Sequence, residues 1–106
     1  MGSRTNEQHR QLLAELNEER VAALTRIART LESLITQLRE LRDRIGTTTA
    51  AGGERDVAAY EELRARARQY RWYLEVQREA LGMRRHEVLD EFYRIPEPLD
   101  AERPTA

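Results

Sequence analysis

Four side chains in the C-terminal half of the chain have the types and spacing of metal ligands. At intervals of 4, 7 and 4 residues stand Glu75, Glu79, His86 and Asp90. A continuous helix would place all four on one side, as ligands are placed in metal-binding helical bundles. The Glu-x-x-His pair of di-iron bundles is missing, because Met83 stands three residues before His86. The set is therefore a weak candidate, and we expect no metal and no cofactor.

An arginine stripe is the second arrangement with a chemical use. Arg64, Arg68 and Arg71 share one helical face and could contact successive phosphates of a nucleic acid. Acidic residues are interleaved with them at salt-bridge spacing, such as Glu75 four residues after Arg71. A solvated, salt-bridged face is the better interpretation, with nucleic-acid binding as an alternative.

No arrangement of residues indicates catalysis. The chain has no cysteine, no nucleophilic serine in an elbow sequence and no glycine-rich phosphate loop. We therefore expect that the protein is not an enzyme.

Composition narrows the class of protein further. A chain of 106 residues that is 35% charged forms one domain with a modest core. The net charge of -1, from 18 basic and 19 acidic residues, predicts no bulk attraction to nucleic acid or anionic lipid. Every basic residue is arginine, as codon bias in a GC-rich bacterial genome would produce. No apolar run approaches the roughly 18 residues of a membrane span, so we expect a cytoplasmic protein.

The strongest structural signal is a coiled-coil seam. Apolar residues recur at gaps of 3 and 4 from Leu24 through Ile27, Leu31, Leu34, Leu38 and Leu41 to Ile45. A second row, Ala14, Val21, Ala28 and Ile35, widens this face beyond the needs of a two-stranded coiled coil. The pattern predicts a long helix in a bundle.

Capping and helix-breaking residues place the ends of this helix. A capping box at Thr5 and Gln8 predicts a helix over 5–46, after a disordered stretch over 1–4. Small and helix-breaking residues over 47–53 predict a loop that turns the chain back antiparallel.

A second helix is expected over 54–95, because Pro96 cannot continue it. A proline-containing tail over 96–106 should be extended or disordered. The residues expected to face the first helix are Tyr60, Leu63, Ala67, Tyr70, Leu74, Leu81, Val88, Phe92 and Ile95.

Polar residues interrupt the first seam towards its N-terminal end, at Asn17 and Arg20. Buried polar residues of this kind fix register and oligomeric state. In a hairpin whose facing residue numbers add up to about 100, both lie near Gln77. We predict that these three residues form a polar layer that sets the register.

A further apolar patch lies where the hairpin cannot bury it. It consists of Trp72, Tyr73, Val76, Ala80 and Met83. At about 100° per residue these side chains lie opposite or beside the stripe that faces the first helix. An exposed apolar patch of this size indicates an interface.

One stretch has a family resemblance. His86 and Asp90, followed by Tyr93-Arg-Ile-Pro-Glu97, resemble part of the C-terminal export signal of the WXG100 secretion proteins. Those proteins are helical hairpins of similar length, so the resemblance implies a secreted hairpin. The chain departs from the family pattern in lacking Trp-x-Gly at the turn and in placing Pro96 inside the Tyr-x-x-x-Glu element.

The sequence thus predicts an all-α, antiparallel, coiled-coil-like hairpin that dimerises into a four-helix bundle. Its expected function is non-catalytic: an interaction or scaffold protein that acts by self-association or by binding a helical partner protein. The alternatives are a nucleic-acid-associated regulator and a WXG100-like secreted hairpin.

Overall fold

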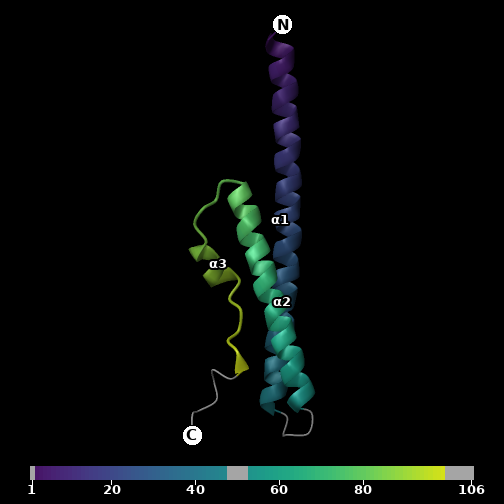
Figure 1. Ribbon diagram of the computed structural model, residues 1–106, viewed down its shortest axis with the longest axis vertical. Helices are drawn as coiled ribbons and strands as arrows, with labels where there is room; N and C mark the ends of the chain where they lie inside the picture. Colours follow the sequence, from purple (N-terminus) through teal and green to yellow (C-terminus); the bar gives the residue numbers. More distant parts are fainter. Residues whose placement is uncertain (1, 48–52, 100–106) are drawn as a thin grey trace.

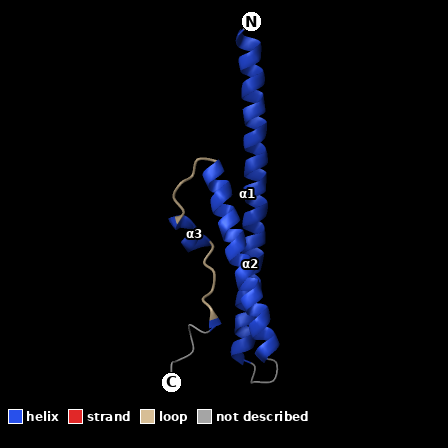
Figure 2. Cartoon of the chain, in the orientation of Figure 1, coloured by secondary structure: helices blue, strands red, loops and turns tan. Residues whose placement is uncertain are grey.

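The computed structural model describes residues 2–47 and 53–99, which form a helical hairpin with a third segment folded back onto it (Figure 1). α1 (Gly2–Thr47) has 46 residues and α2 (Gly53–Ala80) has 28. α3 (Glu87–Phe92) is a short helix in the returning segment. None of the described residues forms a strand (Figure 2). The prediction of an all-α hairpin is confirmed.

The predicted seam of α1 forms the centre of the core. The buried residues are Leu31, Leu34, Ile35, Leu38 and Leu41 of α1, Tyr60, Ala67 and Leu74 of α2, and Leu89 of α3. The remaining seam residues, Leu24, Ile27 and Ile45, pack against this cluster. Ile35 shows that the wider apolar face is also used, because it lies in the second row and is buried. The spacing therefore identified the buried face of α1 correctly.

Two contacts at opposite ends of the hairpin define its register. Near the turn, Arg44 Nη2 lies 3.6 Å from Asp56 Oδ1. At the other end, Arg20 Nη1 donates a hydrogen bond of 3.4 Å to the carbonyl oxygen of Ala80. In both pairs the residue numbers add up to 100, which confirms the predicted antiparallel register.

α1 begins earlier than the capping box predicts. Its first described residue, Gly2, is already helical, so Thr5 lies inside the helix and not at its N-cap. No proline precedes Thr5 to prevent another turn, and helix ends are the least determined part of a helix. At the other end, Thr47 and Gly53 are helical, and the rest of the predicted loop lies outside the described residues.

The predicted helix over 54–95 is wrong beyond Ala80. Gly82 adopts a φ of 88°, in the left-handed region where a side chain is disfavoured. Its N–H donates to the Glu79 carbonyl at 2.9 Å, and the Met83 N–H donates to the Arg78 carbonyl at 2.9 Å. This pair of bonds is a Schellman motif, which satisfies the last carbonyls of a helix and ends it.

Residues 83–99, named the strap here, then run back along α2 toward the turn of the hairpin (Figure 1). Leu89 of α3 is buried, whereas Val88 and Phe92, which were expected to face α1, are exposed. Because the Schellman turn reorients the chain, the helical phase of α2 does not continue into α3. Tyr93, Ile95 and Leu99 also pack against the core, so the part of the predicted tail that is described is docked.

α1 extends far beyond the end of α2 (Figures 1 and 2). Because Ala80 lies level with Arg20, residues 2–19 have no part of α2 opposite them. This stretch, named the overhang here, is about 27 Å long at about 1.5 Å per residue. The molecule consequently has a covered half and a single-helix half.

Candidate functional site

The strap is held on the hairpin by hydrogen bonds from α2. The hydroxyl of Tyr60, whose side chain is fully buried, donates to the carbonyl oxygen of Glu97 at 2.7 Å. Arg64 Nε donates to the carbonyl oxygen of Pro96 at 3.0 Å. A buried hydroxyl and a partly buried guanidinium both need acceptors, and the backbone around Pro96 supplies them. The extended conformation that proline imposes therefore serves docking.

The start of the strap is fixed by a second set of contacts. Arg78 Nη2 donates to the carbonyl oxygen of Arg85 at 2.9 Å, and Arg78 Nε lies 3.4 Å from His86 Nδ1. Arginine is only a donor, so Nδ1 is the acceptor and Nε2 of His86 carries the hydrogen. That Nε2 lies 3.1 Å from Glu79 Oε1, which accepts the hydrogen bond. The imidazole thus links the strap to the last turn of α2.

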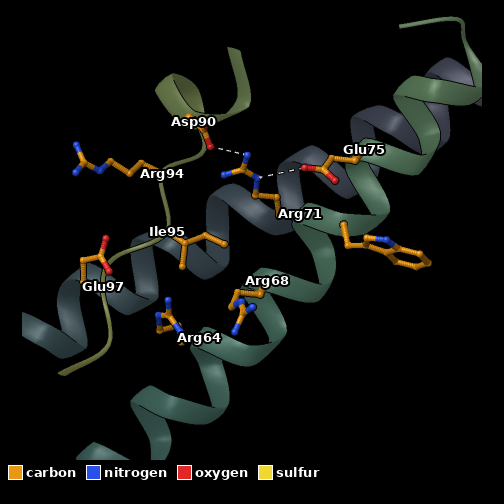
Figure 3. Close-up of a pocket in the computed structure, with 9 residues that line it drawn as sticks. Arg64, Arg68, Arg71, Glu75, Asp90, Arg94, Ile95 and Glu97 are labelled. Atoms are coloured by element: carbon orange, nitrogen blue, oxygen red, sulfur yellow. Dashed lines mark ion pairs between the residues drawn. The ribbon is translucent and has the colours of Figure 1, made fainter. Parts of the chain in front are cut away.

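An ion pair joins α2 to α3 between these two sets of contacts. Arg71 Nη2 lies 2.6 Å from Asp90 Oδ1, and Arg71 Nε lies 3.9 Å from Glu75 Oε1 (Figure 3). The guanidinium is mostly covered, whereas the Asp90 carboxylate is largely exposed, so the pair contributes modestly to stability. Its position fixes the distance between α3 and α2.

These contacts leave a cleft between α2 and the strap (Figure 3). Its volume is about 590 Å³, and it is lined by Arg64, Arg68, Arg71, Trp72, Glu75, Asp90, Arg94, Ile95 and Glu97. Within the described residues, Arg68 and Arg94 form no ion pair. The lining has four arginines and three carboxylates, so it is only weakly positive. A second hollow, of about 340 Å³, lies on the side of the strap that faces Arg39 and Arg42 of α1.

The arginines predicted as nucleic-acid contacts all line this cleft, but two of them have contacts within the chain. Arg64 donates to the strap backbone, and Arg71 pairs with Asp90 and Glu75. Only Arg68 of the three has no such contact in the described part of the chain. The stripe therefore holds the strap in place and presents one unpaired guanidinium.

The four weak metal candidates separate into two pairs. Glu79 contacts His86, while Glu75 and Asp90 both lie at Arg71. Their predicted shared face required a helix that continues past Ala80, and the Schellman motif removes it. Among residues 2–47 and 53–99, no three potential metal ligands lie together.

The predicted interface patch is exposed but is not one straight stripe. Trp72 is 59% exposed, and Val76, Ala80 and Met83 are also exposed. Tyr73 is half-buried; its ring lies edge-on to Tyr70 at a centroid distance of 5.5 Å and tilted against Trp72 at 5.6 Å. Met83 follows the end of α2 and so does not continue the helical face.

Only part of the predicted polar layer forms. Arg20 reaches across to α2, and Gln77 is half-buried beside that end of the hairpin. Asn17 is exposed, because α2 ends level with Arg20 and leaves nothing opposite it. Of these three residues, Arg20 is the one with a contact between the two helices in the described part of the chain.

The overhang has an apolar face that the second helix was expected to cover, because the seam extended backwards places Leu13 in register near Val88, with Leu16 beside it; Leu12 was not singled out. Leu12, Leu13 and Leu16 are 64, 47 and 40% exposed, and every residue from 5 to 19 is exposed. At about 100° per residue, Leu13 and Leu16 fall within the arc of α1 that the buried seam occupies, and Leu12 lies at its edge, next to the direction of Leu41. The apolar side of α1 is therefore present again in the overhang, beyond the polar seam positions Asn17 and Arg20, and α2 does not cover it there. The signal was available in the sequence as the i, i+4 pair of Leu12 and Leu16.

None of the helices in the described residues has the length and hydropathy of a segment that spans a bilayer. Comparisons of the chain with protein families, with characterised proteins and with solved structures find no match.

Proposed function

We propose that this chain is a non-catalytic helical interaction protein that self-associates through the apolar face of its overhang. The observation that carries the proposal is the exposure of Leu12, Leu13 and Leu16, clustered on one side of the uncovered overhang. Three large apolar side chains clustered on one face are typical of an interface, whereas single exposed ones are ordinary.

The lack of packing in the overhang supports the same proposal. Helical stability in proteins comes mainly from packing of an apolar face and less from intrinsic helix propensity. Residues 2–19 have no packing partner in the hairpin, yet they continue α1 without a break. A bound partner would supply the packing that this stretch lacks.

Nucleic-acid binding by the arginine stripe has less support. Arg64 and Arg71 are occupied by the strap, and three carboxylates line the same cleft. A WXG100-like export signal has less support too, because its residues Asp90 and Glu97 take part in docking the strap.

The test compares two surfaces and one control by light scattering on a sizing column across a concentration series. Leu12→Ser with Leu16→Ser should convert an associated wild-type chain into a monomer. Gln11→Ser with Glu18→Ser introduces the same residue on the opposite face of the overhang and should leave the mass unchanged. Both doubles have a similar helix propensity, so the difference between them reports the apolar face.

The predicted four-helix bundle gives a different result in the same experiment. Such a bundle would bury Trp72 and Val76, so Trp72→Ser with Val76→Ser would then dissociate it. Loss of association in that variant alone contradicts the proposal. A wild-type chain that stays monomeric at every concentration also contradicts it.

A further inference from the structure

We infer that the partner of the overhang is the overhang of a second copy, paired antiparallel over residues 9–19. This inference rests on the proposed function and names the occupant of the surface. An isologous pair of this kind has a two-fold axis and closes as a dimer.

The face of the overhang is complementary to itself in the antiparallel direction. Glu19, Leu12, Leu16, His9 and Leu13 fall, in that order, within about 120° of the helix circumference. When Leu12 is set opposite Leu16 of a second copy, symmetry sets Leu16 opposite Leu12. The same register sets His9 opposite Glu19 at both ends of the paired stretch. The contact thus has two central layers in which Leu12 meets Leu16, and one outer layer at each end in which His9 meets Glu19.

Charge favours this direction over the parallel one. In a parallel, in-register pair, Glu19 would face Glu19 and His9 would face His9, which brings like groups together. In the antiparallel pair an imidazole N–H donates to a carboxylate, whether or not the ring is also protonated. Glu15 lies at the edge of the antiparallel contact, near its own copy, where two carboxylates in water repel each other only weakly.

Over residues 9–19 the hairpin leaves the side of α1 open for a second helix, and residues 5–8 of the second copy would lie level with residues 20–23, beside the end of α2. All residues from 9 to 19 are exposed, and the paired stretch ends one residue before Arg20 meets Ala80. Within it, therefore, α2 of neither copy lies beside the contact. Leu13 and Leu16 lie on the side of α1 whose seam α2 covers from Leu24 onward, beyond the polar seam positions Asn17 and Arg20. The two straps would then lie toward opposite ends of the dimer.

Cysteine pairing tests the direction directly, because the chain has no cysteine of its own. Chains with Leu12→Cys and chains with Leu16→Cys, one of them carrying a size tag, are oxidised separately and as an equimolar mixture. We expect the disulfide-linked heterodimer in the mixture to exceed the homodimers formed by either variant alone. Homodimers of Leu12→Cys as the main product would show parallel pairing and overturn the inference.

A charge exchange tests the outer layers without altering the leucines. His9→Glu should place two glutamates face to face at both ends and weaken dimerisation by about tenfold. His9→Glu with Glu19→Lys should restore it, because each glutamate then faces a lysine of the second copy. Positions 9 and 19 are about 15 Å apart along one helix, so recovery reports contact between copies. Absence of recovery overturns the register.

Failure of this inference and failure of the proposed function are distinguishable. If the leucine double variant leaves association unchanged, the overhang is not the interaction surface. If it abolishes association but the cysteines pair in parallel, or the charge exchange fails to restore dimerisation, the surface is correct and the antiparallel arrangement is wrong.

Discussion

Leu38 and Leu12 lie on the same helix with opposite surroundings. Leu38 is fully buried beneath α2 in the covered half of α1, and Leu12 is 64% exposed in the overhang. Both parts have strong helix-forming sequences, with no glycine or proline from residue 3 to residue 45. The comparison shows that helix formation and burial are decided separately along α1: local sequence sets the first, and the length of α2 sets the second.

The largest expected change in the free energy of unfolding comes from a substitution in the covered half of α1. Leu38→Ala should lower the free energy of unfolding by about 2–5 kcal/mol, because it leaves a cavity among packed residues. Leu12→Ala, measured at concentrations low enough to keep the chain dissociated, should change it by less than about 0.5 kcal/mol. Urea denaturation followed by circular dichroism measures both. Equal losses would mean that the overhang folds against something within the same chain.

The strap provides the next contrast, between Leu89 and Phe92 of α3. Leu89 is buried and Phe92 is exposed. Leu89→Ala should cost about 2 kcal/mol, toward the low end of the range for leucine truncations, since a short helix can detach locally and limit the loss. Phe92→Ala should cost almost nothing. Hydrogen exchange of the amides in 87–99 would show faster exchange only in the Leu89 variant if the strap is docked as described.

This segment also marks the limit of what could be predicted from the sequence. Spacing of apolar residues predicted the hairpin, its seam and its register, because a periodic face must be buried by something of matching length. It placed Val88 on the buried face, one residue from the correct Leu89, because the phase was carried across Gly82. A single glycine was enough to end α2, and its effect depends on a backbone conformation that periodicity does not report.

The placement of the candidate residues was predicted correctly inside α2 and incorrectly where the prediction depended on where α2 ends. Trp72 and Val76 are exposed, as expected, because they lie inside α2 and their phase is correct. The metal candidates form two separate pairs because the chain reverses at the Schellman turn. His86 therefore returns beside Glu79, and Asp90 returns to Arg71, which Glu75 also approaches. Leu12 was overlooked because exposure of the overhang follows from where α2 ends, which is information about another segment.

Replacing Gly82 tests the Schellman turn, and replacing Gly46 in α1 is the matched comparison, with an expected change in stability of the opposite sign. Gly82→Ala should destabilise the protein by about 1–2 kcal/mol, since alanine is strained at a φ of 88° even though nothing obstructs its side chain. Gly46→Ala lies in α1 with open space around the new methyl group, and should stabilise by up to about 1 kcal/mol. Thermal or urea unfolding of the two variants in parallel gives the comparison. A gain in stability at position 82 would contradict the described end of α2.

The smallest expected change in stability comes from removing a single hydrogen bond in the covered half. Tyr60→Phe keeps the ring in the core and removes only the hydroxyl that donates to the Glu97 carbonyl at 2.7 Å. We expect a loss of about 1 kcal/mol, because the freed carbonyl lies in the strap and can be hydrated if that segment shifts. The change should appear as faster hydrogen exchange near residue 97, with the overhang unaffected. The overhang amides serve as an internal reference, because no contact of Tyr60 extends to that half of α1. If exchange quickens equally in both regions, the covered half and the overhang unfold as one unit and the distinction between them fails.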